Sequence, residues 1–404
     1  MQKNIIYFCR EYNDIDHVVP IADELLKDKS VSSLCFFNYN LNKSFSDDYR
    51  ISYLRRNRNF NYIEYCQILN VKETFLLNFL EILKKFHHYF HKVKSDYINN
   101  IYKKTKIENI GIKIEDSTFL FDHSNSVFLD VAFDFSNLHK IPIGLLMHGL
   151  DPTENILMET NMLRINDLDN DWGHYNKSDR YFVNNEHYNN RSLSHGVANN
   201  IINKVGSARF SYKWSNVLTK ITPDIELPHP DPSFVKVVLM LNKYRYNTWK
   251  EEIERVIKTL LLIKGVFLII KPHTRNMRFE DLKNERILIA DDQYHSRKLI
   301  EWADLVLFTL SSIFLDALLV KKPVLSLRLS TSNKLACNHI MRDWNVDSRD
   351  DLLEWVNHFK KDRKTRTYTE EERLECLNYY VNDQDNQLLS RYSKSILDLK
   401  KRGQ

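Results

Sequence analysis

The second half of the sequence alternates short apolar runs with helical patterns, and this alternation constrains the fold more than any other feature. Amphipathic stretches at 249–263, before Trp302 and at 312–320 separate apolar runs at 235–241, 266–270, 287–290, 305–308 and 324–327. A strand that is apolar on both faces belongs to a parallel sheet covered by helices. The second half is therefore expected to form a doubly wound α/β domain.

The first half follows the same plan less regularly. Its apolar runs, each bounded by polar or turn residues, lie at 4–9, 32–37, 118–121, 143–147 and 180–183. Apolar residues recur at helical spacing through 73–94, which predicts a long helix there. With 404 residues, 43% of them apolar, the chain is large enough to build two cores.

Prolines mark the junction between the halves. Residues 221–233 hold Pro223, Pro228, Pro230 and Pro232, which can continue neither a helix nor a central strand. We predict an N-terminal Rossmann-like domain at 1–220, a linker at 221–234, a C-terminal Rossmann-like domain at 235–335 and a helical segment at 336–404. The expected fold class is α/β, with two doubly wound domains that face each other across a ligand-binding cleft.

Composition narrows the possible partners and location. Every apolar run is far shorter than the ~20 residues of a membrane helix, and the first residues are typical of a strand, so we expect a cytoplasmic protein. The five cysteines lack metal-ligand spacing and are expected to be buried thiols. A net charge of +5 suits an anionic substrate or peripheral contact with the inner face of the membrane. Basic and acidic residues are interleaved, so no nucleic-acid partner is expected.

The strongest chemical signal follows the apolar run at 266–270. Lys271, His273 and Arg275 come directly after it, at the edge where an open α/β sheet binds its ligand. Cationic side chains and an imidazole N–H can donate to phosphate oxygens. The alternative is a solvent-exposed loop with incidental charge.

A second polar edge follows the run at 305–308. Ser311 and Ser312 fall where the strand is expected to end and a helix to begin, and a helix N-terminus binds anions. Asp316, one turn further on, can accept hydrogen bonds from ribose hydroxyls. The alternatives are a simple serine cap and a solvated aspartate.

These residues carry a resemblance to a known family. Lys-Pro-His at 271–273, Ala-Asp-Leu-Val-Leu at 303–307 and the run from Ser311 to Val324 resemble the donor-binding domain of bacterial surface-polysaccharide transferases. That group includes CDP-glycerol glycerophosphotransferases and transferases that use CMP-Kdo. The resemblance covers about 235–330, and extends more weakly to Gly206–Arg209. It implies that Lys271, His273, Arg275, Ser311 and Ser312 hold the donor phosphates, although the family's His-Pro pair is His-Thr here.

The resemblance implies a GT-B glycosyltransferase that needs no metal and no cofactor. Its leading reaction is transfer of Kdo from CMP-Kdo to lipopolysaccharide or a capsular polysaccharide. The partners would be a nucleotide-activated sugar donor and a glycan or lipid-linked glycan acceptor. A CDP-glycerol or UDP-sugar donor, a UDP-sugar 2-epimerase and a non-catalytic subunit of glycan assembly remain alternatives.

The N-terminal domain is expected to bind the acceptor and to supply the catalytic group. After the apolar run at 143–147 come His148, Gly149, Leu150, Asp151 and Pro152. Asp151 can deprotonate an acceptor hydroxyl or attack the anomeric carbon, and His148 can orient it or replace it. The alternative makes Asp151 the cap of a helix that starts at Pro152. Weaker candidates are Asp122, His123 and Asp231.

Overall fold

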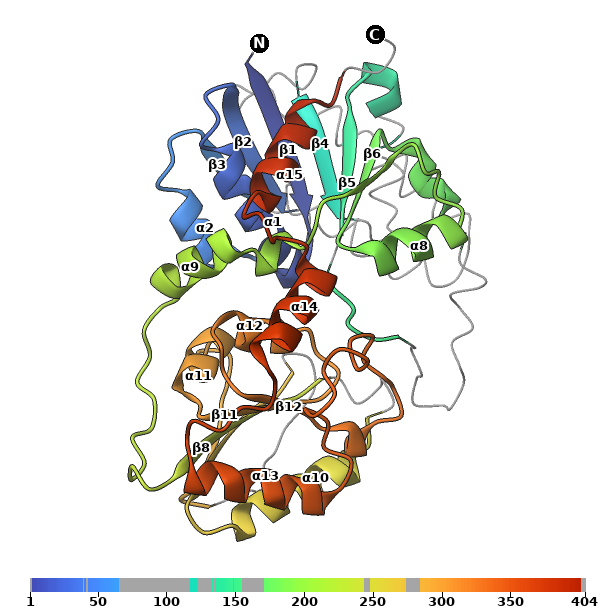
Figure 1. The fold of residues 1–404 in the computed structure, drawn as a ribbon. Coiled ribbons are helices and arrows are strands. Elements are labelled where there is room, and N and C mark those ends of the chain that lie inside the picture. The colour runs from blue at the N-terminus through green and yellow to red at the C-terminus, as the bar shows by residue number, and fades with distance from the viewer. Residues whose placement is uncertain are drawn as a thin grey trace, which may run out of the picture. The chain divides into compact units, whose positions relative to one another are not determined.

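The chain folds into two compact units (Figure 1). The computed structural model describes residues 2–38, 40, 43–64, 117–122, 133, 136–147, 149–154, 171–242, 248–273 and 284–400. Unit 1 comprises residues 1–149, 171–214 and 383–404, and unit 2 comprises 150–170 and 215–382. Neither unit is a simple half of the chain, because residues 150–170 belong to unit 2 and the C-terminal residues return to unit 1. The helix predicted at 73–94 lies outside the described residues.

Unit 1 is built on a parallel sheet of seven strands in the order β3-β2-β1-β4-β5-β6-β7. Their bounds are β1 Lys3–Cys9, β2 Val31–Asn38, β3 Phe60–Glu64, β4 Ser117–Asp122, β5 Ile143–Leu146, β6 Arg180–Val183 and β7 Ile202–Lys204. The five strands predicted from apolar runs are present. The edge strands β3 and β7 were not predicted, because most of their side chains are only half-buried and no apolar run marks them.

Aromatic packing holds the centre of this sheet. Phe8 on β1 stacks on Phe121 on the neighbouring β4, with ring centroids 4.4 Å apart. The helical elements are α1 Tyr12–Leu25, α2 Tyr49–Leu54, η3 Gly173–Lys177, α8 Glu186–Ser194, η4 Ala208–Phe210 and α15 Leu388–Leu397. Helix α9 (Tyr212–Ile221) carries the chain from unit 1 into unit 2.

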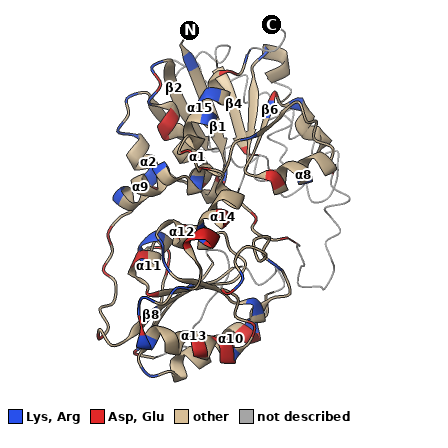
Figure 2. Ribbon diagram, viewed as in Figure 1, with Lys and Arg blue, Asp and Glu red and all other residues tan. Residues whose placement is uncertain are grey.

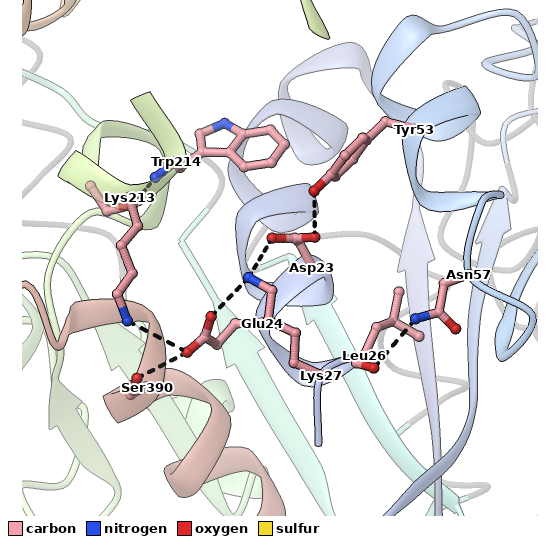
Figure 3. Close-up of polar contacts among 10 residues, drawn as sticks. Asp23, Glu24, Leu26, Lys27, Tyr53, Asn57, Lys213, Trp214 and Ser390 are labelled. Atoms are coloured by element: carbon pink, nitrogen blue, oxygen red, sulfur yellow. Dashed lines mark hydrogen bonds and ion pairs between the residues drawn. The ribbon is translucent and has the colours of Figure 1, made fainter. Parts of the chain in front are cut away.

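The C-terminal helix α15 is fastened to α1, far away in the sequence (Figures 1 and 3). Ser390 Oγ donates to Glu24 Oε1 at 2.9 Å, and Lys213 Nζ lies 3.8 Å from the same carboxylate oxygen. On the next residue of α1, Asp23 accepts a hydrogen bond from Tyr53 of α2 at 2.8 Å. Polar contacts along one face of α1 thus join the start of α9, helix α2 and the end of the chain.

Unit 2 is built on a parallel sheet of five strands in the order β10-β9-β8-β11-β12. The strands are β8 Val235–Met240, β9 Val266–Lys271, β10 Ile287–Ile289, β11 Leu305–Phe308 and β12 Val324–Ser326. The helical elements are α10 Lys250–Leu262, α11 Ser296–Trp302, α12 Phe314–Leu319, η5 Arg328–Ser330, α13 Arg349–Lys361 and α14 Glu370–Val381. All five strands predicted for this half are present, and the central ones are wholly buried.

The proline-rich stretch predicted as a linker has no regular secondary structure from residue 223 to 231 and runs along unit 2. The indole Nε1 of Trp302 donates to the carbonyl oxygen of Pro228 at 2.9 Å. Lys298 of α11 forms an ion pair with Asp224 at 2.6 Å. This stretch is therefore tied to α11 by two polar contacts.

Charge is mixed in both units (Figure 2). Lysine and arginine side chains alternate with aspartate and glutamate along the described helices, and most ion pairs are exposed. Exposed pairs of this kind contribute little to stability. Within the part of the chain that the structure describes, no helix is long and apolar enough to span a membrane.

A buried arginine is the exception to this exposed charge. Arg50 of α2 is 1% exposed and forms ion pairs with Asp16 of α1 and, at 2.7 Å, with Asp48. Asp16 also pairs with Arg209, the arginine of the segment that resembles the family's Gly-x-x-Arg. Burial raises the pKa of Asp16, but Arg209 and Arg50 outweigh it and hold that pKa below the ordinary value of 3.8.

We predict that Arg50→Ala lowers the free energy of unfolding of unit 1 by about 3–5 kcal/mol, because it leaves carboxylates buried without their cation. Arg58→Ala, an exposed arginine four residues beyond α2, is the control and should change stability by less than about 0.5 kcal/mol. Urea unfolding of both variants measures the difference. Equal stabilities would show that the buried pairs contribute nothing net.

Candidate functional site

The carboxyl edge of the five-stranded sheet is the candidate site, and its centre lies between β8 and β11. The chain runs outward from β8 through β9 to β10 on one side, and through β11 to β12 on the other. Such a change of direction leaves a crevice at the carboxyl ends of the two central strands, where open α/β sheets bind ligands. Residues that follow β8, β9 and β11 are therefore the ones to examine.

Three buried polar residues connect the ends of β8 and β11. Thr309 Oγ1 accepts the backbone N–H of Asn242 at 3.1 Å and donates to Asn242 Oδ1 at 2.6 Å. Asn242 Nδ2 in turn donates to Thr248 Oγ1 at 3.0 Å. All three residues are at most 6% exposed. The hydroxyl of Thr309 thus ties the two strands together where they separate.

The sequence analysis missed this group. Asn242 directly follows the apolar run at 235–241, and Thr309 directly follows the run at 305–308. A polar residue at the end of a buried strand was the signal used for Lys271, and it applied equally to these two positions. They were passed over because neither carries a charge.

Lys271 and His273 lie at the end of β9, as predicted, and both are half-buried. The ammonium group of Lys271 donates to the backbone carbonyl of Asp291, which follows β10. Because an ammonium carries three N–H donors, this bond uses only one of them. Burial lowers the pKa of Lys271 from 10.5, and the carboxylates of Asp292 and Asp291 oppose that change. Arg275 lies outside the described residues.

The turn after β11 differs from the prediction. Helix α12 begins at Phe314 and its cap is Ile313, so Ser311 and Ser312 precede the helix instead of opening it. The backbone N–H of Ser311 donates back to Thr309 at 3.1 Å, and Leu315 N–H donates to the carbonyl of Ser312 at 3.0 Å. These turn hydrogen bonds postpone the helix by two residues.

Ser311 and Ser312 stay half-buried near the end of β11, whereas Asp316 does not reach an open surface. Asp316 lies in the first turn of α12 and is only 4% exposed. A carboxylate buried to this degree offers little surface to a ribose hydroxyl. Its proposed contact with ribose would require the surrounding side chains to move.

Asp151 is placed in unit 2, although the sequence had suggested the N-terminal domain. Its Oδ1 accepts the backbone N–H of Thr153 at 3.0 Å and the hydroxyl of Thr153 at 2.6 Å. Residues 151 and 152 are not helical, so Asp151 closes a local turn and does not cap a helix that starts at Pro152. His148 lies outside the described residues.

The weaker candidates are in other places. Asp122 is the last residue of β4, beside β1, at the corresponding edge of the unit 1 sheet, and it is buried. Asp231 precedes β8 and accepts the backbone N–H of Ser233 at 2.8 Å, so it lies at the opposite end of the strand from Asn242. His123 lies outside the described residues. Among the described residues, no three His, Cys, Asp or Glu side chains are grouped to hold a metal ion.

Comparison with known proteins identifies the fold. No protein-family model matches the sequence, and no curated protein is similar to it. Among solved structures, a UDP-GlcNAc 2-epimerase from Neisseria meningitidis bound to UDP-GlcNAc has a TM-score of 0.55 at 13% identity, covering 98% of this chain and 100% of its own.

Two further solved structures show the same similarity. The glycotransferase of kitacinnamycin has a TM-score of 0.53 at 10% identity, over 97% of this chain and 99% of its own. The Anabaena protein HepE, in complex with UDP and glucose, has a TM-score of 0.52 at 10% identity, with the same coverage. At these identities the similarity shows the fold, which is the GT-B type with two Rossmann-like sheets, as predicted.

We predict that Thr309→Val lowers the free energy of unfolding of unit 2 by about 1–3 kcal/mol, because the N–H and Oδ1 of buried Asn242 both lose their partner. Thr309→Ser keeps the hydroxyl and should retain most of the stability. Chemical denaturation of the two variants gives the comparison. A serine variant as unstable as the valine variant would mean that packing of the methyl group matters and the hydrogen bonds do not.

Proposed function

We propose that this protein is a glycosyltransferase of the GT-B fold that takes its sugar from a nucleotide-activated donor bound by unit 2. One observation carries the proposal: Lys271 and His273 follow β9 at the same sheet edge where Asn242 and Thr309 join β8 to β11. Cationic and N–H donors at such an edge suit the phosphates of a nucleotide. The solved structures with this fold include complexes with UDP-GlcNAc and with UDP and glucose.

The donor itself can be narrowed by experiment. Similarity to the surface-polysaccharide transferases favours CMP-Kdo, whereas the structural neighbours contain uridine nucleotides. All of these donors place a phosphate next to the anomeric carbon, so the same side chains can serve each of them. Peripheral contact with an anionic membrane remains part of the proposal, since a lipid-linked acceptor would be reached there.

Asp151 is the proposed catalytic carboxylate. In glycosyl transfer the bond between the anomeric carbon and the phosphate oxygen breaks, and a bond to an acceptor oxygen forms. A carboxylate can accept the proton of the acceptor hydroxyl, or attack the anomeric carbon to form a covalent intermediate. Cationic and N–H donors stabilise the charge that develops on the departing phosphate.

A UDP-sugar 2-epimerase is the second candidate, favoured by the similarity to the enzyme from Neisseria meningitidis over the full length of that chain. The two activities separate cleanly in one assay. An epimerase changes the configuration of UDP-GlcNAc at C2 without any acceptor and releases no nucleotide as its product. A transferase converts the donor to free nucleotide and a glycosylated acceptor.

We predict that one donor among UDP-GlcNAc, UDP-glucose, CMP-Kdo and CDP-glycerol stabilises the protein against heat. At 100 times its Kd a ligand adds about 2.7 kcal/mol to the free energy of unfolding. His273→Ala should keep the melting temperature of the free protein and lose the donor-dependent increase. His358→Ala, on the exposed face of α13, is the control and should respond as the parent does. If all four donors leave the parent unchanged, unit 2 is not a site for these compounds.

We predict that Asp151→Asn lowers kcat about 10²–10⁴-fold, the usual contribution of a general acid or base. The amide keeps an oxygen that accepts from Thr153, so the local turn and the stability should be preserved. Nucleotide release from the donor selected above measures kcat, and thermal unfolding measures stability. Turnover close to that of the parent would move the search to Asp122 and His123.

A further inference from the structure

The segment that carries Asp151 is built into unit 2 as a short added strand. Residues 150–154, here named the strap, pair in antiparallel fashion with residues 334–336. Thr153 lies opposite Leu335, the N–H of Glu154 donates to the carbonyl of Lys334 at 2.8 Å, and the N–H of Ala336 donates to the carbonyl of Pro152 at 2.9 Å. The strap therefore has a defined register and does not hang as an open loop.

One buried hydroxyl fastens the strap to the rest of unit 2. Tyr380 of α14 is 1% exposed, and its Oη donates to the carbonyl of Pro152 at 2.8 Å. The same oxygen accepts the backbone N–H of Cys337 at 3.1 Å. Tyr380 thus bridges the residue that follows Asp151 and the segment with which the strap pairs. Both ends of this bridge are backbone groups, so the hydroxyl fixes main-chain position.

The segment opposite the strap leads back to the candidate donor site. Thr331 pairs with Thr248 in an antiparallel bridge, and the Oγ1 of Thr331 accepts the N–H of Asn333 at 3.1 Å. Thr248 is the partner of Asn242 at the end of β8. A run of hydrogen bonds within unit 2 therefore extends from the end of β8, through residues 331–336, to the strap.

We infer that Tyr380 is a positioning residue for Asp151, holding the strap so that this carboxylate is fixed to the donor-binding unit. The inference rests on the proposed function, since it gives Asp151 the catalytic role. It adds a residue 229 positions away, on α14, whose hydroxyl touches neither donor nor acceptor. Thr153 completes the linkage, because its hydroxyl and N–H hold the Asp151 carboxylate directly.

The first test compares two tyrosine variants that lose similar hydrogen bonds. Tyr380→Phe removes the hydroxyl that binds the strap, whereas Tyr368→Phe removes a hydroxyl that donates to the carbonyl of Lys322 at 2.9 Å, also in unit 2. Tyr380→Phe should lower kcat about 10- to 100-fold with the donor KM nearly unchanged, as expected for a misplaced catalytic group. Tyr368→Phe should keep both values. Turnover is measured with whichever of UDP-GlcNAc, UDP-glucose, CMP-Kdo or CDP-glycerol binds.

A double mutant separates positioning from general loosening. If Tyr380 acts through Asp151, adding Tyr380→Phe to Asp151→Asn should lower kcat no further. Thr153→Val should resemble Tyr380→Phe, and Thr153→Ser, which keeps the hydroxyl, should restore turnover. Normal turnover of Tyr380→Phe beside an inactive Asp151→Asn would overturn the inference and leave the proposed function standing. Additive losses in the double mutant would also overturn it.

Amide hydrogen exchange tests the positioning without relying on activity. In Tyr380→Phe the amides of Glu154 and Ala336 should exchange faster than in the parent, while amides in β8 and β11 should be unchanged. The Tyr368→Phe variant should leave the strap protected. Unchanged exchange at Glu154 and Ala336 would refute the role of Tyr380 even if no donor is turned over, which is the outcome that would count against the proposed function itself.

Discussion

Parallel pairing of β8 with both β9 and β11 is the constraint on which the rest of unit 2 depends. Val237 lies opposite Leu268 on one side and Leu305 on the other, and all three side chains are wholly buried. Strands buried on both faces leave polar groups only at their ends. Because all five strands run in the same direction, those polar ends gather on one edge, and the edge becomes reactive surface by default. The hydroxyl of Thr309 closes the gap that this pairing opens between β8 and β11.

The fold was largely readable from the sequence because its cause is local. An apolar run such as 235–241 identifies a central strand wherever it occurs, and the alternation with helices identifies the class. The edge strand Ile202–Lys204 escaped detection, since one of its faces is open and its residues are mixed. The late start of α12 was equally hidden, because competing turn hydrogen bonds at Ser311 and Ser312 leave no mark in the composition.

The candidate site was only partly predictable, for a different reason. Lys271 and His273 announce themselves by charge at the end of a strand, but Asn242 and Thr309 gain meaning only from being neighbours in space. The membership of Asp151 in unit 2 depends on pairing with Leu335, which is 182 residues further along the chain. Pairing at such a distance cannot be read from the residues around Asp151. Sequence reasoning thus finds chemical groups more easily than it finds their supports.

The return of α15 to unit 1 has a consequence for how this protein is made. Ser390 binds Glu24 across 366 residues of sequence, so the first helix to leave the ribosome must wait for one of the last. Unit 2 can complete itself earlier, because its residues end at 382. Synthesis at about 5–20 residues per second leaves the face of α1 that α15 covers exposed for tens of seconds. Nascent chains of this protein are therefore natural clients for a chaperone that shields apolar helix faces.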